Sequence, residues 1–249
     1  MKLALFLILY LISNNLLFSQ NTKKATYSIV TSENEKTKNL PEHLKKTIQD
    51  AEDASENLLP ILIFNDSISV FKLEENTIIN NDLSVTTICK CKKPVFTLAK
   101  KNIVLRNNNN SIAVKEDEFI IIDSLQKKWS ITAETKKIES FTCYKATQEI
   151  TIINAAKNID GSAKISKKII TAWFSPEIPY SFGPSGYGGL PGLILELQDE
   201  NKLFGLQKLE SVSANTQILL PTKGKEISSM EYNSILKAKS TELMKSKEK

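Results

Sequence analysis

The sequence predicts a mainly β fold of the α+β class: a curved antiparallel sheet or half-open barrel with one or two peripheral helices. Short apolar runs recur along most of the chain, and Asn, Asp, Gly and Lys separate them. Only two segments carry apolar residues at helical spacing. Strands that follow one another without intervening helices pair antiparallel, because parallel neighbours need a long crossover.

The first 19 residues have the layout of a signal peptide. Lys2 precedes an apolar run from residue 3 to residue 12, a polar break follows at 13–15, and Ser19 is a small residue suited to cleavage. The apolar run is shorter than the roughly 20 residues that span a bilayer, although an uncleaved anchor remains an alternative. We therefore expect residues 20–249 to form a single soluble β-rich domain that is periplasmic or secreted, with no transmembrane segment after cleavage.

Local signals place the elements in order. Tyr27 and Ile29 alternate in an opening strand at 25–31, and Pro41 begins a helix that runs to residue 58. Asn65 and Asp66 form the turn of a hairpin between strands 61–64 and 68–73. Further strands are expected at 96–98, 103–105, 119–122, 129–133, 141–146, 150–153, 165–174, 193–197 and 203–209.

The remaining signals concern turns, faces and the last helix. Asparagine-rich stretches at 107–110 and 158–161 predict loops. Trp129, Ile131 and Ala133 alternate with polar residues, so their strand is expected to have one buried and one solvated face. Ser228 and Glu231 have the spacing of a capping box that opens a peripheral helix over 228–243.

The charge pattern argues against nucleic-acid binding. The chain carries 33 Lys and Arg against 28 Asp and Glu, and its net charge of +5 falls to +4 if Lys2 leaves with the signal peptide. Arg106 is the single arginine, so the bidentate donors that usually bind phosphates and base edges are nearly absent. The excess of lysines is typical of a solvated surface.

Three cysteines leave one thiol over if a disulfide forms. An exported chain meets oxidising conditions, and we expect any bridge to join Cys143 to Cys89 or Cys91. A bond between Cys89 and Cys91 would close a strained loop. A zinc site needs about four ligands, and the chain has one histidine and no second pair of cysteines, so we expect no metal and no cofactor.

Glycine and proline cluster in one segment, residues 176–192, here called the Gly/Pro loop. Five of the eight glycines lie between 183 and 192, and four of the eight prolines between 176 and 191. Proline fixes φ and glycine admits special conformations, so the cluster predicts a shaped loop between two strands. A dinucleotide loop is excluded because the third glycine comes one residue late and a strand follows. The candidate binding residues are this loop and its aromatic neighbours: Trp129, Trp173, Pro179, Gly183, Pro184, Tyr187, Gly189, Leu190, Pro191 and Gly192.

The motif Gly189-Leu190-Pro191-Gly192-Leu193-Ile194 resembles the signature of the GLPGLI family of exported proteins from Bacteroidetes-type bacteria. The flanking segments at 129–138, 141–146 and 172–174 are similar to that family as well. The resemblance implies an exported, β-rich protein. It implies no activity, cofactor or catalytic residue, because none is established for the family.

We assign no catalytic residue. His43, the only histidine, is expected to be an exposed helix residue, and no nucleophile motif accompanies it or Cys143. We expect a non-catalytic module that binds an envelope partner or an apolar ligand near the Gly/Pro loop; several exported carriers enclose an apolar cavity under such a loop. The alternatives are a purely structural envelope protein and a hydrolase that uses two carboxylates from Glu134, Asp160, Glu177, Glu196 and Asp199.

Overall fold

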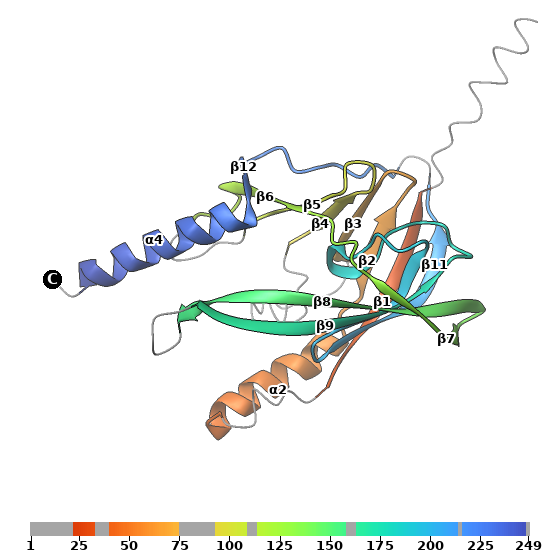
Figure 1. Ribbon diagram of the computed structural model, residues 1–249, viewed down its shortest axis with the longest axis horizontal. Coiled ribbons are helices and arrows are strands. Elements are labelled where there is room, and N and C mark those ends of the chain that lie inside the picture. The colour runs from red at the N-terminus through yellow and green to blue at the C-terminus, as the bar shows by residue number, and fades with distance from the viewer. Residues whose placement is uncertain are drawn as a thin grey trace, which may run out of the picture.

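A single curved sheet organises the molecule (Figure 1). The computed structural model describes residues 22–32, 40–74, 93–108, 114–157, 163–213 and 216–247, which form 12 strands and two α-helices. The strand order is β12-β6-β5-β4-β3-β2-β1-β11-β10-β9-β8-β7. All neighbours pair antiparallel except β12 and β6, which are parallel. The expected mainly β fold with few helices is confirmed.

The observed strand bounds lie within two residues of the predicted ones, except for the strands at 130–138 and 141–157, which extend four or five residues further. The strands are β1 (Lys23–Thr31), β2 (Pro60–Phe64), β3 (Ile68–Leu73), β4 (Val95–Leu98), β5 (Ile103–Asn107), β6 (Phe119–Ser124), β7 (Ser130–Ile138), β8 (Phe141–Lys157), β9 (Ala163–Ser175), β10 (Leu193–Asp199), β11 (Lys202–Ser211) and β12 (Lys225–Ser228). The helices are α2 (Glu42–Glu56), α4 (Ser229–Lys247) and the short 3₁₀ helix η2 (Pro184–Gly186).

The sheet curls until its two ends approach each other. Strands β6 and β7 are ten positions apart in the strand order, which would be about 48 Å in a flat sheet. Residues 125–129 alone connect them, and such a link spans at most about 20 Å. The two halves of the sheet are therefore folded toward each other, as in a half-open barrel.

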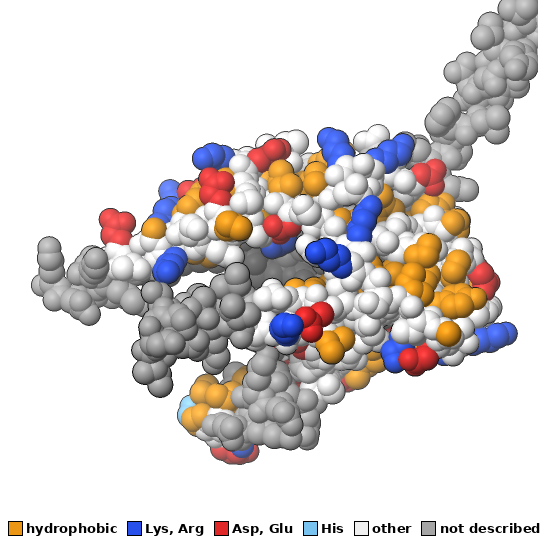
Figure 2. Space-filling model, in the orientation of Figure 1, with side chains coloured by type: hydrophobic (Ala, Val, Ile, Leu, Met, Phe, Trp, Pro, Cys, Tyr) orange, Lys and Arg blue, Asp and Glu red, His pale blue; other side chains and the backbone are white. Residues whose placement is uncertain are grey.

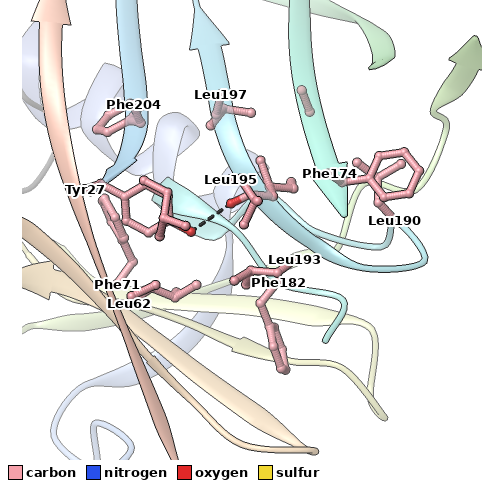
Figure 3. Close-up of a cluster of buried hydrophobic side chains, with 14 of the residues drawn as sticks. Tyr27, Leu62, Phe71, Phe174, Phe182, Leu190, Leu193, Leu195, Leu197 and Phe204 are labelled. Carbon is pink, nitrogen blue, oxygen red and sulfur yellow. Dashed lines mark hydrogen bonds between the residues drawn. The ribbon is translucent and has the colours of Figure 1, made fainter. Parts of the chain in front are cut away.

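The main core lies on the inner face of this curve. Tyr27 of β1, Phe71 of β3, Phe174 of β9 and Phe204 of β11 belong to one buried cluster and are each at most 2% exposed (Figure 3). Helix α2 packs against β1 through Ala51, and its predicted apolar stripe contacts the core only near its C-terminal end.

Helix α4 is attached at its beginning and extends away from the sheet (Figure 1). The predicted capping box is confirmed in part: the Ser228 hydroxyl accepts a hydrogen bond from the Glu231 N–H at 3.1 Å. The Asp123 carboxylate of β6 accepts from the Ser229 hydroxyl at 2.6 Å, which places a negative charge at the positive end of the helix. Tyr232 packs on Phe119 of β6 with ring centroids 6.0 Å apart.

Three details of the predicted strands are wrong. The expected buried face of residues 129–133 does not form, because β7 is an edge strand with a bulge between Ile131 and Thr135, and Ile131 is 52% exposed. The strands expected at 141–146 and 150–153 are one strand, β8, since pairing with β9 keeps Thr147–Glu149 extended. Strand β12 has no prediction, because one apolar residue, Ile227, is too weak a signal.

Candidate functional site

The Gly/Pro loop fills part of the concave side of the sheet. Its side chains Ile178, Phe182 and Leu190 are at most 4% exposed and belong to the main core. Figure 3 shows Phe182 and Leu190 within this cluster. The N–H of Ile194 donates to the carbonyl of Phe182 at 2.9 Å, so the loop pairs with the start of β10. The turn at Gly186 lies against Val104 of β5. The loop therefore joins the two halves of the curved sheet.

Glycine is required at two positions of this loop for different reasons. A Cβ atom at Gly192 would lie 2.1 Å from the carbonyl oxygen of Ser175, so only glycine allows the backbone to approach β9 this closely. Gly189 has a φ of +83°, in the left-handed region. The motif that carries the sequence resemblance thus has a packing function.

The predicted binding residues do not form one surface. Gly183, Pro184, Leu190 and Gly192 are buried, Pro179 and Pro191 are exposed, and Trp129, Trp173, Tyr187 and Gly189 are intermediate. Trp129 contacts the loop on the inner side, where its Nε1 donates to the Gly188 carbonyl at 2.9 Å. Trp173 alternates with the buried Ala172 and Phe174 of β9 and so lies on the outer face. The two tryptophans cannot line one common pocket.

A buried ion pair anchors the loop to the sheet. Asp199 at the end of β10 is 2% exposed and lies 2.7 Å from Nζ of Lys168 on β9. Its second carboxylate oxygen accepts from the Tyr187 hydroxyl at 3.2 Å. Burial, and then the nearby Asp199 charge, raise the pKa of Tyr187, so this phenol stays a neutral donor. In the sequence analysis Asp199 is only a candidate acid, and no local signal distinguishes Lys168.

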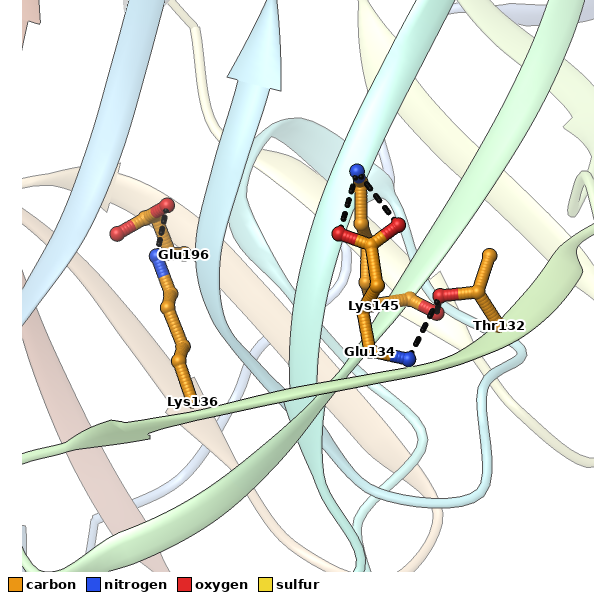
Figure 4. A network of polar contacts seen from close by, with 5 residues as sticks. All are labelled: Thr132, Glu134, Lys136, Lys145 and Glu196. Carbon is orange, nitrogen blue, oxygen red and sulfur yellow. Dashed lines mark hydrogen bonds and ion pairs between the residues drawn. The ribbon is translucent and has the colours of Figure 1, made fainter.

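The outer face of the same strands carries a separate polar network (Figure 4). Lys136 of β7 lies 2.7 Å from Glu196 of β10 and 4.5 Å from the centroid of the Trp173 ring. Lys145 of β8 binds both oxygens of Glu134 at 3.0 Å. These half-exposed pairs fix the position of β7 over its neighbours, and each is expected to stabilise the fold only weakly.

Cys143 is a buried thiol in the part of the chain that the structure describes. Its side chain is 0% exposed, and burial raises its pKa to about 11. A thiol in this environment is a poor nucleophile, because thiolate is the reactive form. Cys89 and Cys91 lie outside the described residues, so the expected disulfide stays a prediction.

The carboxylates of the alternative hydrolase mechanism have other partners. Glu134 and Glu196 pair with lysines on the outer face, whereas Asp199 pairs on the inner face. Glu177 accepts from the Thr142 N–H at 2.9 Å, and Asp160 lies outside the described residues.

Four further observations concern possible sites. His43 is exposed on α2, as expected. No group of three His, Cys, Asp or Glu residues suited to a metal occurs among the described residues. Within the same ranges, no helix is both long and apolar enough to cross a membrane. Figure 2 shows basic and acidic side chains interspersed over the visible face, without one dominant basic patch.

The comparisons with known proteins give a family of unknown function and a shared fold. Residues 129–196 match the model of a family described as "Protein of unknown function (Porph_ging)". Two solved structures, "Structure of PNGF-II in P21 space group" and "Structure of PNGF-II in C2 space group", resemble the chain with TM-scores of 0.51 and 0.50, each at 16% identity. The match covers 86% and 87% of this chain but 33% and 32% of those chains, so this chain spans about a third of their length. At this identity the likeness shows the fold alone, and the search of curated proteins gave no match.

Proposed function

We propose that this chain is an exported, non-catalytic binding module of the GLPGLI family, with residues 1–19 as its signal peptide and a periplasmic or secreted location. Its partner is an envelope protein that binds the loop rim, defined as Pro179, Tyr180, Gly189 and Pro191. The observation that carries the proposal is the rigid outward presentation of these residues by a loop whose other side is buried in the core. The family match over residues 129–196 includes the whole rim.

Hydrogen bonds hold the two segments of the loop rim side by side. The Ser181 hydroxyl donates to the Leu190 carbonyl at 2.7 Å, and the Gly189 N–H donates to the Ser181 carbonyl at 3.1 Å. Tyr180 is fixed by the Phe64 ring, whose centroid is 5.0 Å away. A partner that binds such a fixed surface loses little loop entropy on association, which favours affinity.

A protein partner is favoured over an apolar ligand because the loop's own side chains occupy the concave core. A ligand inside would have to displace Phe182 and Leu190, which are 1% and 2% exposed. Hydrophobic side chains also gather at the right of Figure 2, where Figure 1 draws β11 and the loops beside it. A contiguous exposed apolar area is typical of protein interaction sites.

A photocrosslinking experiment tests the proposal. A photoreactive residue replaces Pro191 in the full chain expressed in its native host, and a matched control carries it at Lys237, an exposed residue of α4. We expect a discrete protein adduct from position 191 and none from 237. Adducts from neither position, or equally from both, would refute a partner at the loop rim. Native mass spectrometry that finds a reproducible apolar small molecule would instead support the ligand alternative.

A further inference from the structure

The turns at one end of the sheet form a continuous group of loops. Strand register puts the start of β1, the β2–β3 turn, the β4–β5 turn and the end of β6 side by side. The two turns are linked by the Ala99 N–H, which donates to the Ser67 carbonyl at 3.0 Å. The Leu125 N–H donates to the Asn102 carbonyl at 2.8 Å. Residues 125–129, which lead from β6 to β7, therefore continue the same group of loops.

The loop rim lies within this group of loops. Tyr180 packs on the ring of Phe64, the last residue of β2, with centroids 5.0 Å apart. Nζ of Lys23, the first residue of β1, lies 5.8 Å from the centroid of the Tyr180 ring. At the other segment of the rim, a Cβ atom on Gly189 would lie 2.7 Å from Cγ of Lys127. A lysine therefore adjoins each of the two segments of the loop rim.

Positive charge dominates the group. Its lysines are here called the lysine cluster: Lys23, Lys100, Lys101, Lys127 and Lys128. Lys23 is half-buried and the other four are exposed, and none forms an ion pair with a carboxylate among the residues that the structure describes. Asp66 is the one acidic residue in the two turns, in residues 125–129 and in residues 178–192. The group thus carries five positive charges against one negative charge.

The lysine cluster and the loop rim together have the extent of a protein interface. Strands β1 and β6 are five positions apart in the strand order, which is at most about 24 Å. A typical interface buries about 800 Å² on each partner, a patch roughly 30 Å across. Charges spread over such a distance match an extended acidic surface, because one small anion can reach only some of them.

The charge pattern favours a protein over an anionic lipid surface. Burial, and then the Asp66 charge, raise the pKa of Tyr180, so a negative charge stands near the ring that the loop rim presents. A protein can place a donor opposite Asp66 and carboxylates opposite the lysines, whereas a membrane of anionic headgroups repels Asp66. Arg106, the single arginine, pairs with Asp123 and is not part of the cluster, so the cluster has no bidentate fork for phosphate.

We propose that the protein partner of the loop rim presents an acidic surface, rich in Asp and Glu, to the lysine cluster. This inference rests on the proposed function, because it names the chemistry of the same partner. Complementary charges of this kind mainly raise the association rate and exclude partners of the wrong charge. Tyr180 and Pro191 of the loop rim provide the apolar contact at the centre.

Photocrosslinking to a defined acidic probe tests the proposal. The mature chain with the photoreactive residue at Pro191 is mixed with a fluorescein-labelled decaglutamate peptide. We expect a labelled adduct at about 0.1 M NaCl that is lost at about 1 M, because the Debye length falls from about 10 Å to about 3 Å. The lysine variant carries Lys100→Gln, Lys101→Gln, Lys127→Gln and Lys128→Gln. It should lower the adduct yield at least about fivefold, since it removes most of the charge that faces the peptide.

A matched control removes the same charge away from the loop rim. It carries Lys115→Gln, Lys223→Gln, Lys225→Gln and Lys237→Gln, which replace exposed lysines of the β5–β6 connection, β12 with the residues before it, and α4. These lysines also form no ion pair in the described part of the chain, and the adduct yield should stay within about twofold of that with all lysines present. Equal losses in the two variants, or no peptide adduct with all lysines present, would overturn the acidic partner.

Crosslinking from position 191 in the native host separates this inference from the proposed function. Absence of a protein adduct with all lysines present refutes the partner itself, and this inference with it, whatever the peptide does. A protein adduct that persists unchanged in the lysine variant keeps the partner and overturns its acidic surface. Flotation with phosphatidylglycerol vesicles that is lost in the lysine variant but not in the control would assign the cluster to a membrane surface and would also overturn the proposal.

Discussion

Replacing Tyr27 with phenylalanine tests how the start of β10 is held. Tyr27 is fully buried on the central strand β1, and its hydroxyl donates to the Ile194 carbonyl of β10 at 2.8 Å. Strand β11 lies between the two, but its ladder with β10 begins only at Glu196. The N–H of Ile194 donates to the Phe182 carbonyl of the loop. Because the N–H and the carbonyl of one residue in an antiparallel strand point to the same side, both groups of Ile194 point away from β9.

The expected cost follows from this geometry. Phenylalanine keeps the ring that packs on Phe71, so Tyr27→Phe creates no cavity and leaves one buried carbonyl without its donor. Such an unsatisfied group costs about 1–3 kcal/mol. For a chain of this size each 1 kcal/mol corresponds to about 2–4 °C in Tm.

Urea unfolding monitored by fluorescence measures this cost. We expect a lower midpoint with an unchanged m-value, because the surface exposed on unfolding is the same. Tyr144→Phe is the control, since Tyr144 is 37% exposed and its hydroxyl forms no hydrogen bond with the residues that the structure describes. A stability of Tyr27→Phe within about 0.5 kcal/mol of the wild type would show that water or another donor satisfies Ile194, and the argument for a hydroxyl-held strand start would fail.

Three further predictions concern the loop, its anchor and the buried thiol. Gly192→Ala should lose at least about 3 kcal/mol of stability or fail to fold, because the new Cβ meets the Ser175 carbonyl. The control is Gly205→Ala, where the atom nearest to the new Cβ is 3.5 Å away, and it should change stability by under about 1 kcal/mol in the same urea assay. Asp199→Ala should lower the free energy of unfolding by about 2–4 kcal/mol, because it leaves the Lys168 charge unpaired. Adding Lys168→Met should recover part of this loss of stability. If the effects of the two substitutions are additive, the proposed coupling of Asp199 and Lys168 is refuted. The pKa of Cys143 is raised to about 11 in the folded state, so the protonated thiol contributes fully to folding stability below pH 9. This contribution, at most about 3 kcal/mol, is lost as the pH rises toward 11. Cys143→Val should flatten this part of the pH–stability profile, and an unchanged slope would contradict the prediction.

Local signals in the sequence were sufficient wherever neighbouring residues decide the conformation. The β2–β3 turn follows from Asn65, whose side-chain oxygen accepts from the N–H groups of Ser67 and Ile68 at 3.0 and 3.1 Å. The start of α4 follows from Ser228, and the bounds of β3 match the apolar run. Clustered glycines and prolines likewise marked the Gly/Pro loop, because those residues restrict or widen φ by themselves.

The faces of the strands were predicted less well, since a face depends on what packs against it. The alternation at Trp129–Ala133 favoured a buried side, but β7 became the edge of the sheet and remained open to solvent. The sequence placed Trp129 and Trp173 in one binding region, and the structure puts them on opposite sides of the sheet. Gln148 stands between Ala146 and Ile150 at the alternate positions of β8 that are otherwise apolar, a signal that could have indicated a buried polar residue on that face.

The sequence by itself determined that the chain forms a strand-rich domain with a shaped Gly/Pro loop, because hydrophobic period and turn chemistry act over a few residues. Only the tertiary structure decided that the loop enters the core, that Asp199 meets Lys168 and Tyr187, and that the Tyr27 hydroxyl reaches Ile194. Those contacts join residues up to 167 positions apart in the chain, from Tyr27 to Ile194. Register is fixed by packing and pairing across the whole sheet, and no short segment contains that information.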